Sequence, residues 1–109
     1  MSAYFVRPAE CGYRVLFQGV EIRTMAGKEM MLSVVNFEPC AEVQTHSHPH
    51  EQIGLLLEGE LLFTIGDERR ELIAGDMWRI PGGVMHHVVA GPGGARALDI
   101  FHPVRQDYL

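Results

Sequence analysis

The sequence predicts an all-β fold, and three observations support this prediction. Short segments rich in Val, Ile, Leu and Phe alternate with Gly and Pro along the chain. No stretch of ten residues keeps the i, i+3, i+4 apolar spacing of an amphipathic helix. About ten such segments, joined by short turns, are typical of a β-sandwich or of a barrel, which removes exposed strand edges and encloses a pocket.

The expected strands follow one another with short connections. They cover residues 13–17, 20–25, 30–37, 43–48, 52–58, 60–66, 69–73, 76–80, 86–90 and 96–102. Hairpin turns are expected at residues 26–29, 58–59 and 66–68, where Gly or Asp tolerates a positive φ. Residues 91–94, Gly-Pro-Gly-Gly, are expected to form a flexible loop. The apolar run 61–65 predicts a strand that is buried on both faces.

Length, charge and cysteine content limit the classes of protein that fit this sequence. A chain of 109 residues is expected to form one domain, residues 1–109. The net charge of −5 and the lack of a basic stripe argue against a nucleic-acid partner, and no apolar run is long enough to cross a membrane. Cys11 and Cys40 show no CxxC spacing, so free thiols are expected. We therefore expect a cytoplasmic protein without an export signal.

Residues 46–52, His-Ser-His-Pro-His-Glu-Gln, are the first place where metal-binding side chains gather. On an extended strand His46 and His48 lie on the same face, so their two imidazoles can hold one ion. His50 shares this spacing, but Pro49 can turn the chain before it. Such a turn makes the amide oxygen of Gln52 available as a third ligand and leaves the role of His50 open.

A second histidine pair, His86-His87, begins the expected strand 86–90, which can return beside the first group. Neighbouring residues on a strand point to opposite faces. We therefore expect His86 to face the first group, and His87 to lie on the surface or to support the site from outside. His102 has no role that the sequence assigns.

The spacing of these residues resembles the two motifs of cupins. The pattern His46-x-His48-x3-Gln52-x6-Gly59 is similar to the first cupin motif, HxH-x3-E-x6-G. The pattern Gly75-x5-Pro81-x-Gly83-x2-His86 is similar to the second. Three positions depart from the usual motifs: Cys40 replaces a Gly, Gln52 replaces an acidic ligand, and Ala90 replaces an Asn.

This resemblance implies a single cupin domain, a double-stranded β-helix or jelly-roll barrel. It also implies four metal ligands, which are His46, His48, Gln52 and His86. Three imidazoles and an amide oxygen suit one divalent first-row ion per chain, such as Ni, Zn, Fe or Mn. Because Gln is uncharged where Glu is usual, the ion is expected to be more electrophilic and suited to Lewis-acid catalysis.

The C-terminal pattern D-x-F-x-P-x-R-x-D-Y, which starts at Asp99, resembles the tail of small KdgF-like cupins of the pectin-degradation type. The Gln ligand and the Pro-His-Glu-Gln run of the first motif resemble the same group. The resemblance implies that Asp99, Phe101 and Arg105 are active-site residues. It also implies an isomerase that converts 4,5-unsaturated uronate monomers into linear ketonised sugars.

The residue types agree with the chemistry of that reaction. Opening the ring of an unsaturated uronate gives an enol, which becomes a 5-ketone once C4 is protonated. A metal ion can stabilise the enolate, Asp99 can carry the proton, and Arg105 can bind the substrate carboxylate at two points. The reaction needs no nucleotide or organic cofactor, and the sequence has no GxGxxG loop.

Two other functions stay open at this point. One is a different cupin enzyme, such as an oxygenase or a sugar isomerase, because one fold hosts many activities. The other is a non-catalytic protein that binds an acidic sugar through the ion and Arg105. A homodimer is also expected, because the segment up to Met25 is apolar enough to add strands to a second barrel.

Overall fold

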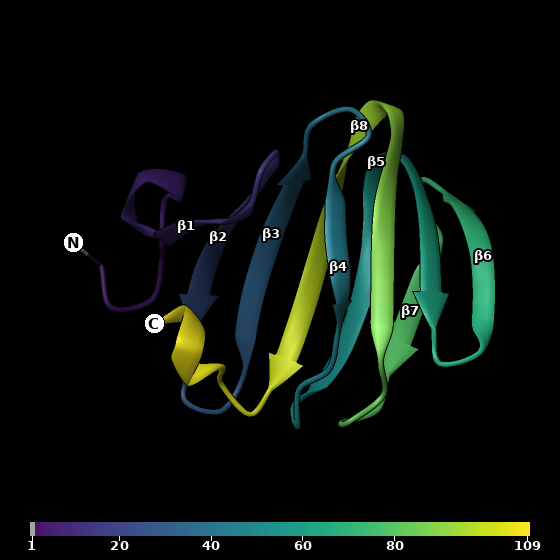
Figure 1. The fold of residues 1–109 in the computed structure, drawn as a ribbon. Helices are drawn as coiled ribbons and strands as arrows, with labels where there is room; N and C mark the ends of the chain where they lie inside the picture. Colours follow the sequence, from purple (N-terminus) through teal and green to yellow (C-terminus); the bar gives the residue numbers. More distant parts are fainter. Residues whose placement is uncertain (1) are drawn as a thin grey trace.

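The computed structural model describes residues 2–109 and forms eight antiparallel strands with two short 3₁₀ turns, so the all-β prediction is confirmed (Figure 1). The strands are β1 (Gly12–Phe17), β2 (Val20–Ala26), β3 (Met31–Phe37), β4 (Glu42–His46), β5 (Glu51–Ile65), β6 (Glu68–Ile73), β7 (Met77–Ile80) and β8 (His86–His102). The 3₁₀ turns are Pro8–Glu10 and Gln106–Tyr108.

Two long strands, β5 and β8, contribute to both layers of the barrel. In one layer the strands follow the order β1-β2-β3-β8-β5-β7, with residues 51–59 of β5 beside residues 95–102 of β8. In the other layer the order is β4-β8-β5-β6, with residues 61–65 of β5 beside residues 86–90 of β8. Figure 1 shows both strands bending over the same end of the molecule between the layers.

The bends correct two expectations from the sequence. Residues 58–59 lie inside β5 and do not form a hairpin, since each half of β5 pairs with β8 and neither half pairs with the other. Residues 91–94 lie inside β8. Gly59 and Gly94 both have positive φ, and a Cβ on Gly59 would lie 2.1 Å from the Gly94 carbonyl oxygen. Glycine therefore allows two paired strands to bend together here, whereas the sequence alone suggested a hairpin and a loop.

The other two expected hairpins are confirmed. Residues 26–29 lie at the connection of β2 to β3, which pair in register from Val20 opposite Phe37 to Ala26 opposite Met31. Residues 66–68 connect β5 to β6. Short connections between antiparallel neighbours of this kind fix the register of the barrel wall.

The core lies between the two layers and is built from alternate residues of each strand. Its buried members include Val20, Ile22, Val35, Leu56, Leu61, Phe63, Leu72, Ile80 and Val88. Each large side chain of this kind contributes about 1.5–3 kcal/mol through removal from water. Leu61 and Phe63 on the inner face are buried, whereas Leu62, Thr64 and Ile65 are half-buried, so the run 61–65 is not buried on both faces as expected.

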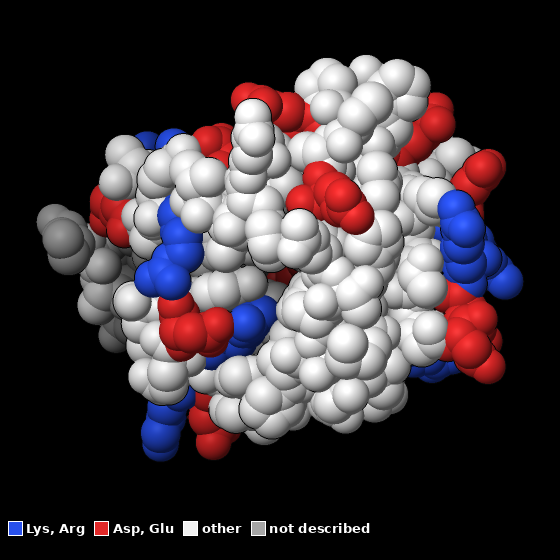
Figure 2. All heavy atoms as spheres, in the orientation of Figure 1, with Lys and Arg blue, Asp and Glu red and all other residues white. Residues whose placement is uncertain are grey.

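Charged residues of both signs occur on the surface of the molecule. Figure 2 shows Lys and Arg dispersed among Asp and Glu on the visible face, without a continuous basic patch. Within residues 2–109, no helix has the length and apolar character needed to span a membrane. Cys11 and Cys40 are both free, as expected.

Candidate metal centre and active site

Three histidines from separate segments meet inside the barrel. His46 ends β4 and lies directly opposite His86, the first residue of β8, while His48 follows two residues after β4. The ring centroid of His86 is 4.2 Å from that of His46 and 5.0 Å from that of His48. One ring nitrogen from each residue lies within 4.8 Å of the other two, so these three side chains can share one metal ion.

Backbone carbonyls orient all three rings. The Nδ1 atoms of His46, His48 and His86 lie 2.9–3.0 Å from the carbonyl oxygens of Gln44, His50 and Val84 respectively. A neutral imidazole that donates from Nδ1 keeps its lone pair on Nε2, which is the arrangement of a metal ligand. The Nε2 atom of His86 is buried without a hydrogen-bond partner. Because buried polar atoms are normally paired, this atom fits a metal ligand.

The electrostatics keep two of these rings neutral near pH 7. Burial lowers the pKa of His86 to about 4. Burial and then the positive charge of Arg105 lower the pKa of His48 from its usual 6.5. Metal binding requires the neutral imidazole, so the pocket prepares both rings for that role.

Gln52 lies where it can add a fourth donor to the three histidines. Its Oε1 atom lies 2.9 Å from Nε2 of His48. In the tautomer set by the His50 carbonyl, both atoms carry lone pairs and neither donates a proton. A cation bound by both removes this conflict, and two adjacent ligands each about 2.1 Å from one ion lie about 3 Å apart. Three imidazoles and one amide oxygen therefore fit a divalent first-row metal ion.

The candidate metal ligands open onto a cavity in the barrel. The enclosed part of the cavity is about 50 Å³, smaller than the about 300–1,000 Å³ usual for small-molecule sites, so a ligand must also occupy its open mouth. Its wall is mostly apolar. The polar side chains that line it are Ser33, His46, Gln52, His86, Asp99, Arg105 and Tyr108.

Asp99 faces this cavity from β8. Burial raises the pKa of its carboxyl group to about 6, although hydrogen bonds from Gln52 and Trp78 and the charge of Arg105 oppose the rise. The indole Nε1 of Trp78 donates to Oδ1 of Asp99 over 2.9 Å. A carboxyl group that gains and loses a proton near neutral pH is suited to general acid–base catalysis.

Comparison with known proteins assigns the chain to a family. Residues 33–101 match the Cupin domain family. This protein is a cupin.

Two relatives with named functions resemble this cupin. The pectin degradation protein KdgF of Dickeya dadantii is 30% identical over 111 residues, which cover 100% of both chains. The dimethylsulfoniopropionate lyase DddW of Ruegeria pomeroyi is 36% identical over 87 residues, 80% of this chain. This cupin spans only 55% of the length of DddW.

Solved structures agree with the fold. An RmlC-like cupin from Shewanella frigidimarina has a TM-score of 0.89 and 28% identity, covering 99% of this chain and 97% of its own. KdgF from Halomonas sp. has a TM-score of 0.86 and 28% identity, covering 100% of both chains. The expected jelly-roll barrel and the resemblance to KdgF-like cupins are therefore confirmed.

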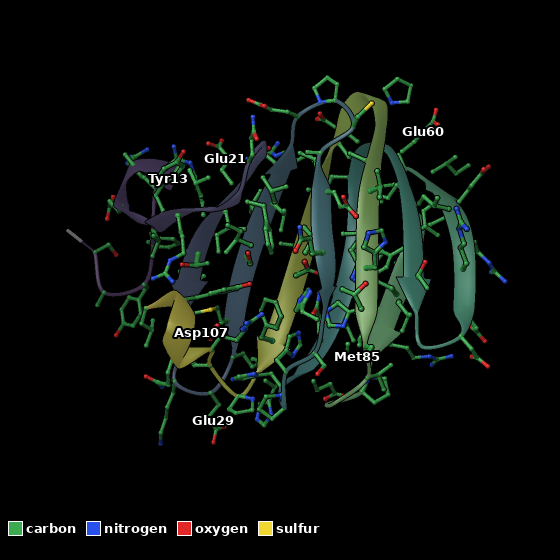
Figure 3. The ribbon with its side chains drawn as sticks, in the orientation of Figure 1. Tyr13, Glu21, Glu29, Glu60, Met85 and Asp107 are labelled. Atoms are coloured by element: carbon green, nitrogen blue, oxygen red, sulfur yellow. The ribbon has the colours of Figure 1, made fainter. Side chains whose placement is uncertain are left out.

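Arg105 was expected to bind a substrate carboxylate, and in the structure it contacts other residues of the C-terminal tail. The side chain is buried and lines the cavity, but each of its three nitrogens already has one partner in the tail (Figure 3 labels Asp107). Its Nε and one terminal nitrogen contact the two carboxylate oxygens of Asp107 at 3.3 and 2.7 Å, and the other terminal nitrogen donates to the Tyr108 hydroxyl over 3.0 Å. Three of its five N–H groups are thus engaged, which leaves one on each terminal nitrogen for a substrate carboxylate.

Phe101 forms part of the wall between the candidate metal ligands and the tail. It is buried with Met31 and Val104. Its ring lies edge-on to His48 at 5.6 Å, and the Arg105 guanidinium lies 5.1 Å from its centre. Phe101 thus shapes the cavity without offering a polar group.

The remaining histidines lie outside the three-histidine cluster. His50 supports His48 through its backbone carbonyl. His87 points outward and contacts Glu42 on the neighbouring strand, as the strand alternation predicted. His102 is exposed.

Sequence reasoning missed Trp78 and Gly54. Gly54 lies between Trp78 and Asp99 in the register of three neighbouring strands. A Cβ on Gly54 would lie 2.1 Å from the indole Nε1 and 2.5 Å from the Asp99 Oδ1, so only glycine leaves room for their hydrogen bond. An isolated glycine inside a strand pattern is the signal of such a close approach.

The structure shows the surroundings of two departures from the cupin motifs. Cys40 adopts a left-handed conformation with φ of 61°, which accounts for the glycine usual at this position. Ala90 is buried in the core, and its N–H donates to the Ala41 carbonyl over 2.8 Å. This backbone hydrogen bond joins Ala90 to the turn before β4.

Proposed function

We propose that this cupin is a metal-dependent enzyme that converts 4,5-unsaturated uronate monomers, released from pectin or alginate, into linear ketonised sugars. The observation that carries the proposal is one cavity lined by candidate metal donors, His46, Gln52 and His86, and by the carboxyl group of Asp99. The full-length similarity to KdgF of Dickeya dadantii supports the substrate class.

The reaction opens the ring, moves protons and has no net change in oxidation state. Ring opening breaks the bond between C1 and the ring oxygen, and the proton of the anomeric hydroxyl group passes to that oxygen to give the enol. The enol O–H bond then breaks, a C–H bond forms at C4, and the C4=C5 double bond becomes the C5 ketone. His46, His48, His86 and Gln52 would hold a divalent ion, which supplies Lewis-acid stabilisation of developing negative charge on oxygen. Asp99 delivers the proton to C4, and Arg105 orients the substrate carboxylate. The largely apolar wall limits the access of water to these groups.

A turnover assay tests the proposal directly. Unsaturated monouronates prepared with a polysaccharide lyase should lose their double-bond absorbance when the metal-loaded protein is added. Elemental analysis should find about one divalent metal ion per chain, and a His46→Ala/His48→Ala double variant should lose it because the remaining donors cannot complete the shell. Unchanged absorbance with each of Ni, Zn, Fe and Mn would reject the activity, and full metal content in the double variant would reject the ligands.

Two variants separate catalysis from binding. Asp99→Asn keeps the shape of the side chain and an acceptor for Trp78 but removes the exchangeable proton. We expect turnover to fall by about 10²–10⁴-fold at equal metal content. Arg105→Ala should raise KM as well, because the carboxylate loses its partner. A non-catalytic sugar-binding protein would show no turnover to lose, and an Asp99→Asn protein with the unmodified rate would eliminate Asp99 as the proton carrier.

Similarity to DddW supports a second candidate, cleavage of dimethylsulfoniopropionate. That elimination also requires a base beside a bound carboxylate, so Asp99 and Arg105 suit it in type. Assays for dimethyl sulfide release and uronate ketonisation on the same preparation distinguish the two. Our proposal expects turnover of the uronate alone. Oxygen consumption during turnover would instead indicate an oxygenase.

A further inference from the structure

Ser33 is an isolated polar residue on an apolar strand face. The inward-facing residues of β3 are Met31, Ser33, Val35 and Phe37, and all four are buried. Ser33 is 1% exposed, and its hydroxyl has no hydrogen-bond partner. An unpaired buried hydroxyl costs free energy that alanine at the same position would avoid. The packing of β3 therefore does not explain the serine.

The position of Ser33 relates it to the cavity. It lies directly opposite Asp99 in the β3–β8 register, so the two side chains project from neighbouring strands on the same face of the sheet. Both residues line the cavity that the candidate metal ligands also line. An unpaired hydroxyl in this wall can donate one hydrogen bond to a molecule in the cavity and accept another.

We propose that Ser33 is a substrate-binding residue that recognises a hydroxyl group of a sugar acid in the cavity. This inference rests on the proposed function, because an acidic sugar is the ligand. Arg105 suits the carboxylate of such a molecule, and an ion held by the candidate metal donors would suit its oxygens, but its other hydroxyl groups also need partners once they leave water. Ser33 supplies one partner from the layer that carries Asp99.

The serine also bears on the choice between the two candidate substrates. A uronate carries several hydroxyl groups, whereas dimethylsulfoniopropionate carries none. A site with a hydrogen-bonding group in place discriminates against a ligand that leaves that group unpaired. Ser33 therefore favours a polyhydroxylated ligand.

Calorimetry with galacturonate, a saturated uronate that cannot be ketonised, tests the role of Ser33 separately from turnover. The metal-loaded protein should bind galacturonate, and Ser33→Ala should weaken binding about tenfold. Ser33→Cys, which nearly preserves the volume and is a poor donor, should also weaken it. Thr24→Val is the matched control. Thr24 is buried on β2 directly opposite Ser33 but does not line the cavity, so its variant should bind normally.

Two further measurements exclude a structural role. Ser33→Ala should leave the Tm of the ligand-free protein equal or higher, because it removes an unpaired hydroxyl. For a set of galacturonate analogues that each lack one hydroxyl, the Ser33→Ala penalty should vanish for the analogue that lacks the recognised group. Unchanged galacturonate affinity in Ser33→Ala, as expected if the hydroxyl only holds a buried water, would overturn the proposal.

The same experiment separates this inference from the proposed function. Galacturonate binding that depends on Ser33, without ketonisation of unsaturated uronate, would reject the reaction and keep the recognition residue. If the protein ketonises unsaturated uronate and Ser33→Ala binds galacturonate with unchanged affinity, the proposed reaction stands and Ser33 is rejected as the recognition residue. No measurable galacturonate binding by the unmodified, metal-loaded protein would reject Ser33 as a sugar contact.

Discussion

At the scale of single residues, Arg105 shows that a side chain of the right type at the right place can already be engaged by another residue. The sequence predicted a guanidinium near the cavity, and the structure places it there. The sequence did not predict that Asp107, two residues later, would contact two nitrogens of the Arg105 guanidinium. Burial alone would raise the pKa of Asp107, but the hydrogen bonds and charge of Arg105 lower it overall. Asp107 therefore stays charged at neutral pH and competes with an incoming carboxylate.

Removing that competing charge should strengthen substrate binding. In Asp107→Asn the neutral side chain contacts Arg105 more weakly than a carboxylate does, so KM for the unsaturated uronate should fall, by up to about tenfold. Glu60→Gln is the control, because Glu60 is an exposed acid at the opposite end of the molecule (Figure 3). Steady-state kinetics of both variants measure the effect. A higher KM in Asp107→Asn would mean that Asp107 positions Arg105 for the substrate.

Cys40 gives a second prediction at this scale. A non-glycine residue in the left-handed region costs about 1–2 kcal/mol, of which glycine's larger chain entropy recovers part on substitution. We expect Cys40→Gly to raise the free energy of unfolding by about 0.5–1 kcal/mol in denaturant titrations under reducing conditions. Cys40→Ala removes the thiol but keeps the Cβ, and should match the parent protein. A glycine variant less stable than the alanine variant would contradict the strain argument.

At the scale of elements, the sequence predicted nearly every position where the chain turns, but it did not predict which strands pair at each of them. Positive φ at Gly59 bends a continuous strand, whereas the hairpin after β2 closes with the same residue types. Local propensity cannot distinguish these two outcomes, because the choice depends on β8, which is distant in the sequence. Strand periodicity alone left the choice between a sandwich and a barrel open, and the resemblance to the cupin motifs predicted the barrel.

The same limit applies to the candidate metal centre. The sequence predicted that His46 and His48 share a face of a strand over residues 43–48, but β4 ends at His46. His48 is oriented instead by the backbone carbonyl of His50, a contact made after the strand has ended. The motif spacing thus predicted which imidazoles meet, and the strand argument gave the wrong reason for one of them.

The close packing of β5, β7 and β8 around Gly54 can be tested by substitution. Gly54→Ala places a Cβ against the indole nitrogen and the Asp99 carboxylate. Overpacking of this kind should lower the free energy of unfolding by about 1–3 kcal/mol and reduce ketonisation. Gly27→Ala is the control, since its Cβ would meet nothing closer than 3.6 Å. Denaturant titration of both variants decides the matter, and a Gly54→Ala protein of normal stability and activity would show that Trp78 can move away freely.

At the scale of the whole molecule, β1 is the edge of its layer and carries exposed apolar side chains. It begins the strand order β1-β2-β3, and the described residues 2–109 offer no partner for its outer edge. Tyr13 and Val15 alternate along one face, Phe17 follows an irregularity in the pairing with β2, and all three are exposed. Tyr4 and Phe5 lie exposed in the segment before β1. An apolar edge of this kind is covered in many proteins by a second copy across a twofold axis.

We predict a homodimer formed through this edge. Light scattering at micromolar concentration should give twice the chain mass of 12.2 kDa. Val15→Lys places a charge in the proposed interface and should shift the protein to the monomer without loss of fold. Ile73→Lys, at an exposed apolar position on β6, is the matched control and should stay dimeric. A monomeric parent protein would reject the dimer, and a dimeric Val15→Lys variant would place the interface elsewhere.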